Sequence, residues 1–316
     1  MTADHSRYMP YSTTFANDLL CGRTALITGG GSGIGLGIAR AMVSVGASVV
    51  LVGRREEVVT AAAAELNGII SSLPSTTEAK AVGLAADVRK PATLEKVMAS
   101  IEDDEQLPPL AVVVNGAAGN FLALAEDLSP NGFATVMGID ALGTFNVCSA
   151  ALPLLRKGAE ALGSPAVVIN ISATLHKPAT WYQSHASAAK AAIDSLTRSL
   201  ALEWGALGVR VVGIAPGPIA HTPGFAKLGG AAEGVYDAIA KVVPAGRIGQ
   251  VTDIGHAALF LASGGAEWIT GATLVVDGGA VLYSQPIMPR SVVASHARSV
   301  EAASRATGLP ATKSRL

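Results

Sequence analysis

The chain has 316 residues, a length that allows one large domain or two ordinary ones. Half of its residues are hydrophobic and 15% are charged, a composition that excludes an intrinsically disordered chain. The formal net charge is −1, so the chain lacks the basic excess of a nucleic-acid-binding protein.

Cysteine usage and the start of the chain narrow the class further. Two cysteines cannot build a disulfide framework, and no spacing of metal ligands is visible, so we expect a reducing compartment and no metal. Residues 1–10 lack the apolar segment of a secretory signal. No apolar run reaches the roughly 18 residues that predict a membrane-spanning helix.

From residue 22 onward, short apolar runs alternate with longer helical patterns. We expect strands at residues 23–28, 48–52, 81–85, 110–115, 166–171, 209–214 and 273–277. We expect helices at residues 34–45, 56–66, 93–101, 130–139, 143–156, 184–204, 231–241 and 252–262. Continuous runs of Val, Ile and Leu are typical of parallel strands buried on both faces. The alternation therefore predicts a single doubly wound α/β domain with helices on both faces of the sheet.

The chain shows no internal repeat beyond this alternation and no second domain. We expect the α/β domain to span residues 22–284 and residues 1–21 to form an N-terminal arm. Residues 285–316 are expected to form a C-terminal tail that is helical around residues 290–304.

A glycine-rich loop connects the first expected strand to the first expected helix. Residues 28–35 read Thr-Gly-Gly-Gly-Ser-Gly-Ile-Gly. Glycines permit a tight turn and let backbone N–H groups approach a pyrophosphate, which the helix dipole then stabilises. The loop predicts a dinucleotide site that includes Gly29, Ser32, Gly33, Ile34 and Gly35.

The end of the second strand predicts which dinucleotide binds. NAD-dependent enzymes usually place Asp or Glu there for the ribose 2′-hydroxyl. This chain has Gly53 at that position, followed by Arg54 and Arg55. Because a guanidinium complements a phosphate with two parallel hydrogen bonds, we expect NADPH, held by Arg54. Alternatively, both arginines only flank the start of a solvated helix.

Several further motifs resemble the short-chain dehydrogenase/reductase family over residues 22–284. They are Asp87-Val88, Asn115-Gly-Ala-Ala, Lys190 and Pro216-Gly217. The resemblance implies a Rossmann domain of about seven strands and a homotetramer. It also implies that Asp87 holds the adenine and Lys190 the nicotinamide ribose. The other cofactor contacts that it implies are Val88, Asn115, Pro216, Gly217 and Ile219.

The usual catalytic tyrosine of that family is missing. The family pattern places a Tyr four residues before the Lys, where the ammonium lowers the phenol pKa. Here Ala186 stands four residues before Lys190, and Ala173 replaces the serine thirteen residues further back. Tyr182 is two helical turns from Lys190, a poor spacing for a substitute. Carbonyl reduction by the usual mechanism is therefore not expected.

A carboxylate takes the place of another family residue. Asp140 stands where a structural Asn is usual. Together with the missing Tyr, this change resembles one subgroup of the family, the peroxisomal 2,4-dienoyl-CoA reductases. The same resemblance extends over residues 115–121, 136–147, 170–176, 185–190 and 215–219. The resemblance implies NADPH-dependent reduction of a 2,4-dienoyl-CoA to a trans-3-enoyl-CoA, a step in the β-oxidation of unsaturated fatty acids.

In the implied mechanism, hydride reaches Cδ of the diene and negative charge spreads to the thioester oxygen. A water held between Asp140 and Lys190 then supplies the proton to Cα, and Asn120 donates to the thioester oxygen. The same resemblance implies acyl-CoA contacts from Arg89, Phe121, Ser129, Asn131 and Lys227.

Each of these roles has a structural alternative. Asp140 would be a helix partner, Lys190 a ribose ligand only, and Asn120 a support of its loop. His176 and His185 are interpreted as structural histidines near a helix start, and Ser172 as a lesser polar contact.

The last three residues, Ser314-Arg315-Leu316, resemble the Ser-Lys-Leu address that directs proteins to peroxisomes. We therefore expect a peroxisomal location and binding to the import receptor. Two other functions stay open: reduction of trans-2-enoyl-CoA or another substrate by the same fold, or cofactor binding without catalysis. The pairing of Asp140 with Lys190 favours an enzyme, because a decaying site has no reason to gain an acid.

Overall fold

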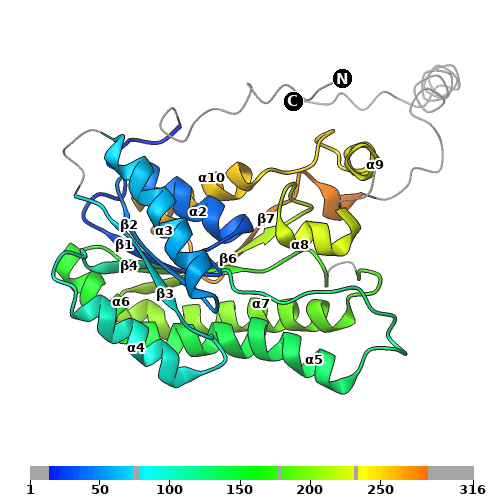
Figure 1. Cartoon of the computed structure of the whole chain (residues 1–316), viewed down its shortest axis with the longest axis horizontal. Coiled ribbons are helices and arrows are strands. Elements are labelled where there is room, and N and C mark those ends of the chain that lie inside the picture. Colours follow the sequence, from blue (N-terminus) through cyan, green and yellow to red (C-terminus); the bar gives the residue numbers. More distant parts are fainter. Residues whose placement is uncertain (1–13, 74–77, 177–178, 231–233, 284–316) are drawn as a thin grey trace, which may run out of the picture. The chain divides into compact units, whose positions relative to one another are not determined.

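The computed structural model describes residues 14–73, 78–176, 179–230 and 234–283 (Figure 1). These residues build a parallel sheet of seven strands in the order β3-β2-β1-β4-β5-β6-β7. Ligands of such sheets bind beyond the carboxyl ends of the strands, where the strand order reverses, here between β1 and β4. The strands are β1 (Thr24–Thr28), β2 (Ser48–Gly53), β3 (Ala81–Ala85), β4 (Leu110–Asn115), β5 (Ala166–Ile171), β6 (Val209–Pro216) and β7 (Thr273–Val276).

The central strands are buried on both faces, as their continuous apolar sequences predict. Every residue of β1, β4, β5 and β6 is buried. Thr28 pairs with Asn115, and Asn115 pairs with Asn170. The register therefore collects polar side chains at the carboxyl edge of the sheet, and the prediction of a doubly wound parallel sheet is confirmed.

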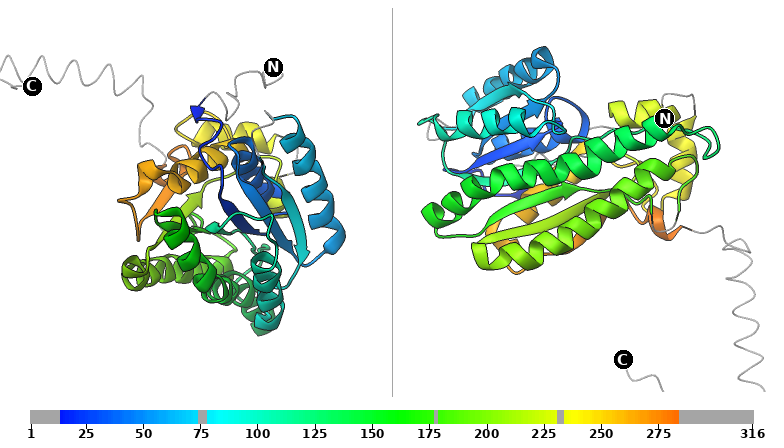
Figure 2. Two further views of the ribbon diagram at one scale, coloured as in Figure 1. Left: turned by 90° about the vertical axis from the view of Figure 1, so that its left-hand side faces the viewer. Right: turned by 90° about the horizontal axis from the view of Figure 1, so that it is seen from below.

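Helices cover both faces of the sheet (Figures 1 and 2). One layer contains α2 (Gly33–Ser44), α3 (Glu56–Ser71) and α10 (Val251–Ala262), with α2 packed against both of its neighbours. The other layer contains α4 (Pro91–Glu102), α6 (Gly143–Leu162) and α7 (Ser184–Trp204). Each layer closes its own apolar core, one around Ile38 and Leu51 and the other around Leu26 and Leu155.

A long helical stretch differs from the sequence prediction. The expected helices at 130–139 and 143–156 are joined, because α5 (Pro130–Met137) continues through a π-helical turn, η2 (Gly138–Leu142), into α6. Gly143 does not break the helix. A Cβ there would lie 2.6 Å from Val88 Cγ2, so the glycine serves close packing.

The same stretch, Pro130–Leu162, is long and apolar enough to cross a membrane by length and composition. In the structure, however, it is a core helix. Its segment α6 packs against β4 and α4, while α5 packs against α7. Among the described residues, no other helix meets the length and hydropathy of a membrane span.

The region after β6 contains elements that the sequence did not predict. A short helix, α8 (Pro223–Phe225), and a second π-helical turn, η4 (Ala226–Gly230), precede α9 (Val235–Val242). The Thr222 hydroxyl begins α8 by accepting the Phe225 N–H at 3.1 Å. The expected helix at 231–241 thus begins later, at Val235.

The ends of the chain are described in part. The Leu20 side chain is buried, and its N–H donates to the Val45 carbonyl at 2.9 Å, so this part of the expected arm packs on the domain. The chain divides into two compact units, Met1–Val281 and Leu282–Leu316. The expected tail helix at 290–304 lies outside the described residues, and the domain bounds stay a prediction.

Candidate active site

The turn between β1 and α2 leaves no room for side chains. Gly29 adopts φ +66°, a left-handed conformation that favours glycine. A Cβ on Gly35 would lie 2.4 Å from the Gly29 carbonyl oxygen, and one on Gly29 would lie 2.7 Å from the Gly116 oxygen. The bare backbone of this turn fits the close approach of a pyrophosphate, as the sequence predicts.

The N-terminus of α2 lies at the same place. Its N-cap residue, Ser32, makes no side-chain hydrogen bond to the helix, and the first turn contains no acidic residue. The first N–H groups of a helix lack intrahelical partners and carry the positive end of the dipole. Ser32, Gly33 and Ile34 therefore form the start of a helix that suits a phosphate group.

Two arginines surround Asp87, which follows β3. Arg89 binds the carboxylate through its guanidinium, with Nε 2.9 Å from Oδ1 and Nη2 2.5 Å from Oδ2, and through its backbone N–H, which donates to Oδ1 at 3.0 Å. These bonds hold the pKa of Asp87 at about 2, and the charge of Arg54 contributes. Arg89, predicted to touch acyl-CoA, thus lies with the predicted cofactor residues Arg54 and Asp87.

Polar side chains connect β4, β5 and α7 at the switch point. Asn115 Nδ2 donates to Asn170 Oδ1 at 2.8 Å, and Asn170 Nδ2 donates to Thr197 Oγ1 at 2.9 Å. Asn115 Nδ2 also lies 3.2 Å from Cys148 Sγ, and burial raises the pKa of that thiol to about 12. The Asn115 amide therefore fixes the spacing of the elements that form the site.

Asp140 and Lys190 form a buried ion pair. Lys190 Nζ lies 3.0 Å from Asp140 Oδ2, with the two side chains 9% and 1% exposed. Lys190 Nζ also donates to the Ile171 carbonyl at 3.0 Å, and the Gly119 N–H donates to Asp140 Oδ1 at 2.6 Å. Within the described residues, Oδ2 makes no aligned hydrogen bond. The carboxylate comes from η2, and π-helical turns are frequent at functional sites.

The loop after β4 and the start of α7 bring further side chains to this pair. Asn120 Nδ2 donates to Gln183 Oε1 at 2.6 Å, and Asn120 Oδ1 accepts the Phe121 N–H at 2.8 Å. The rings of Phe121 and His185 lie 4.3 Å apart. Burial lowers the pKa of His185, while the Phe121 backbone and the charge of Asp140 act in the opposite direction.

The comparisons with known proteins agree with this geometry. A family model described as "Enoyl-(Acyl carrier protein) reductase" matches residues 29–281. A curated relative from Arabidopsis thaliana, "Peroxisomal 2,4-dienoyl-CoA reductase [(3E)-enoyl-CoA-producing]", is 47% identical over 95% of this chain and 98% of its own. A solved short chain dehydrogenase from Bacillus anthracis is 34% identical, with a TM-score of 0.69 over 84% of this chain and 99% of its own.

The chain belongs to the short-chain dehydrogenase/reductase family. Another solved structure, a gluconate 5-dehydrogenase from Burkholderia cenocepacia in complex with NADP and tartrate, is 29% identical. Its TM-score is 0.74 over 85% of this chain and 100% of its own. The expected membership of the family is confirmed.

The tyrosine of the short-chain dehydrogenase/reductase pattern is replaced in this chain. Ala186, where the family pattern has Tyr, is 1% exposed and packs with Val136 and Ala189. Tyr182 is half exposed, and its carbonyl accepts the Ala123 N–H at 3.0 Å. The acid that lies against Lys190 is Asp140.

The structure distributes the predicted substrate residues over several elements, with Arg89 after β3 and Phe121 in the loop after β4. The Ser129 hydroxyl caps α5 by accepting the Gly132 N–H at 3.0 Å, and Asn131 is exposed on that helix. Lys227 is exposed on η4. In the loop after β6, Gly217 packs against Asp277, and the buried Ile219 pairs with Gly249.

Sequence reasoning missed two contacts of the site. The Gly119 N–H fixes Asp140, and its place beside Asn120 in the chain was the available signal. Gln183 fixes Asn120, and no signal in the sequence pointed to that contact. His176, interpreted as structural, lies 3.0 Å from Asp194, one helical turn after Lys190. Ser172 is buried, and its hydroxyl finds no hydrogen-bond partner among the described residues.

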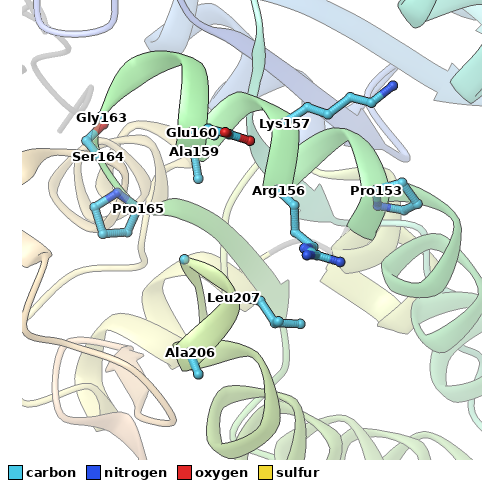
Figure 3. A pocket seen from close by; sticks show the side chains of 11 residues that line it. Pro153, Arg156, Lys157, Ala159, Glu160, Gly163, Ser164, Pro165, Ala206 and Leu207 are labelled. Carbon is cyan, nitrogen blue, oxygen red and sulfur yellow. The ribbon is translucent and has the colours of Figure 1, made fainter.

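A cavity of about 680 Å³ lies elsewhere (Figure 3). Its lining includes Arg156 and Gly163 near the end of α6, Pro165 just before β5, and Gly208 just before β6. It therefore opens at the amino edge of the sheet, opposite the candidate site. Within the described residues, no group of three or more His, Cys, Asp or Glu is arranged to hold a metal ion.

Proposed function

We propose that this enzyme reduces 2,4-dienoyl-CoA to trans-3-enoyl-CoA with NADPH in peroxisomal β-oxidation of unsaturated fatty acids. The observation that carries the proposal is the buried pair of Asp140 and Lys190, 3.0 Å apart, in a site without the family tyrosine. The curated relatives named peroxisomal 2,4-dienoyl-CoA reductases from Arabidopsis thaliana and from other organisms support it.

The cofactor site fits a nicotinamide dinucleotide phosphate. The glycine turn and the start of α2 would take the pyrophosphate, and Asp87 with Val88 the adenine. Arg54 would pair with the 2′-phosphate, because its position after Gly53 has no acid to hold a 2′-hydroxyl. The nicotinamide half would lie against Asn115, Lys190 and the loop of Pro216, Gly217 and Ile219. When bound, this cofactor supplies a hydride to the diene.

The residues of the chain supply the rest of the chemistry. Negative charge that develops on the thioester oxygen requires donors. Asn120, which follows Gly119 in the loop that contacts Asp140, would provide one with the amide N–H that its bond to Gln183 does not use. Asp140 Oδ2 and Lys190 Nζ, in direct contact at 3.0 Å, would together bind a water beside the pair, and that water would give its proton to Cα of the substrate. The proton at Cα and the hydride at Cδ leave the remaining double bond at position 3.

The acyl-CoA would enter over α5 and η4. Phe121 would contact the acyl group, and Ser129 and Asn131 the pantetheine. Lys227 would meet a CoA phosphate as a point charge, without the two parallel bonds that arginine offers. Arg89 would contact the acyl-CoA while it stays bound to Asp87, which is the residue expected to hold the cofactor adenine.

The location and the assembly belong to the same proposal. Ser314-Arg315-Leu316 would bind the peroxisomal import receptor; these residues lie outside the described part of the chain. The homotetramer follows from the family resemblance, and association between copies is supported by the edge strand β7, where Leu274 and Val275 are 41% and 47% exposed. An apolar edge strand is a liability unless another chain covers it.

A substrate comparison tests the function. The purified full-length protein, with NADPH, receives a 2,4-dienoyl-CoA, a trans-2-enoyl-CoA or a 3-oxoacyl-CoA, and the consumption of NADPH is followed. We expect turnover with the dienoyl-CoA and a product whose double bond is at position 3 by mass spectrometry. Absence of turnover with the dienoyl-CoA would refute the proposal. Turnover with the 2-enoyl-CoA instead would favour the second candidate, which the description of the matched family model supports.

A further inference from the structure

Two loops at the mouth of the site are fastened to each other. Residues 119–124 follow β4, and residues 181–185 lead into α7. The Ala123 N–H donates to the Tyr182 carbonyl at 3.0 Å, and Asn120 donates to Gln183 at 2.6 Å. The Phe121 and His185 rings add a tilted contact, with their centroids 4.3 Å apart. Three contacts between two short segments make them one structural unit.

The outer surface of this unit is apolar. Trp181 is 81% exposed and Tyr182 51%, with ring centroids 5.9 Å apart; Leu122 and Leu124 are 47% and 46% exposed. We call these four side chains the rim patch. Adjoining exposed apolar side chains mark a binding surface more often than isolated ones do. Tyr182 also adopts φ +63°, which is costly for an aromatic residue and tends to be retained at functional sites.

The rim patch is continuous with the catalytic pair. The Gly119 N–H donates to Asp140 Oδ1 at 2.6 Å, the same loop continues through Phe121 to Leu122, and the Phe121 ring lies 4.3 Å from the His185 ring. Contacts thus lead from the carboxylate outward to apolar surface. Any ligand whose reacting atoms lie at Asp140 and whose remainder is apolar would extend over these side chains.

We propose that the rim patch binds the aliphatic tail of the acyl-CoA substrate and makes the enzyme selective for long chains. This inference rests on the proposed function, because the tail is the part of a dienoyl-CoA beyond the carbon that accepts the hydride. Because that carbon lies at the reacting centre, the aliphatic tail would extend from it toward the rim of the site. Each methylene group that packs on apolar surface gains roughly fourfold in binding.

A chain-length comparison in the full-length enzyme tests the inference. Trp181→Ser removes the most exposed ring, and Tyr182→Asn removes the second ring while keeping a residue that tolerates positive φ. For a sixteen-carbon dienoyl-CoA we expect KM to rise about tenfold or more in the double variant, from two or more lost methylene contacts. For the six-carbon substrate, kcat and KM are expected to stay unchanged. The conservative single variant Trp181→Phe, which keeps an aromatic ring, should have a KM for the sixteen-carbon substrate close to that of the wild-type enzyme.

Trp268→Ser is the matched control. Trp268 is fully exposed and precedes β7 at the amino edge of the sheet, so its loss should leave both substrates unaffected. Equal changes of KM for short and long substrates in the double variant would overturn the inference. A changed oligomeric state by light scattering without a chain-length effect would overturn it too, because the patch would then bind a second copy. If the wild-type enzyme reduces neither substrate, the proposed function itself fails.

Discussion

Replacing Asp140 by asparagine removes one charge from the buried pair and leaves the size of the side chain almost unchanged. The Asp140 side chain is 1% exposed, and its Oδ2 lies 3.0 Å from Lys190 Nζ. Its Oδ1 accepts the Gly119 N–H at 2.6 Å, a bond that the carbonyl oxygen of asparagine can keep. The substitution therefore tests the charge separately from the shape of the site.

The expected effects follow from the burial of the pair. Positioned proton transfer is worth about 10²–10⁴-fold, so kcat should fall by that factor, or about 3–5 kcal/mol of barrier. Breaking a buried pair costs about 3–5 kcal/mol of stability, because the ammonium stays buried without its counter-charge. The bond from Lys190 to the Ile171 carbonyl softens this loss. A fall of Tm on the order of 10 °C is expected.

The assay combines three measurements on Asp140→Asn: dienoyl-CoA turnover, NADPH affinity by fluorescence, and thermal unfolding. Turnover should be lost while NADPH still binds. Glu65→Gln is the control, since it breaks an exposed pair with Arg40 and should cost no more than about 1 kcal/mol of stability without changing turnover. Wild-type kcat in Asp140→Asn, in a folded protein, would show that the carboxylate plays no part in proton delivery.

Three further variants, one of them with a matched control, test the cofactor side of the site. Arg54→Gln should weaken NADPH binding roughly 10–100-fold and leave NADH unaffected, because only the phosphate uses the charge; equal losses in titrations of both would remove Arg54 from the 2′-phosphate. Gly35→Ala should abolish NADPH binding, because its Cβ would lie 2.4 Å from the Gly29 carbonyl oxygen; normal binding in a calorimetric titration would contradict the proposed role of the turn. Gly68→Ala is the control. Because open space surrounds Gly68, this variant should raise the free energy of unfolding by about 0.5–1 kcal/mol, which thermal unfolding measures. The pKa of Asp87 is lowered to about 2, so its pair with Arg89 stabilises the fold above pH 4, and this stabilisation is lost as the pH falls toward 2. Arg89→Gln should therefore reduce the change of unfolding free energy between pH 4 and pH 2, by no more than about 1 kcal/mol because the pair is partly exposed. An unchanged pH dependence of unfolding would show that the pair does not stabilise the fold.

The sheet could be predicted because strands that are buried on both faces require continuous runs of apolar residues in the sequence. The strand at 166–171 was predicted with its observed bounds, Ala166–Ile171. Helix ends were harder, since they depend on packing outside the segment. The sequence analysis separates two helices between residues 139 and 143, whereas the structure joins them through η2. The close approach of Gly143 to Val88, which excludes a side chain there, is a packing contact that the local sequence does not report.

The pairing of Asp140 with Lys190 was predicted from two departures from the family pattern, and the structure brings the two side chains into contact. The engagement of Arg89 with Asp87 was not predicted, although the residues are two apart, because an exposed arginine has many possible directions. The bond between Asn120 and Gln183 joins segments far apart in the sequence, and no local pattern reports such a contact.

The π-helical turn η2 also sets the rotational phase of the longest helical stretch. A helix advances about 100° per residue, so the extra residue of a π turn rotates everything before it relative to everything after it. On one side of η2, α5 faces α7; on the other, α6 faces β4. Deleting a single residue here would restore a regular helix but turn α5 away from α7 whenever α6 kept its place on the sheet. The single extra residue of η2 therefore determines both where Asp140 lies and how α5 packs against α7.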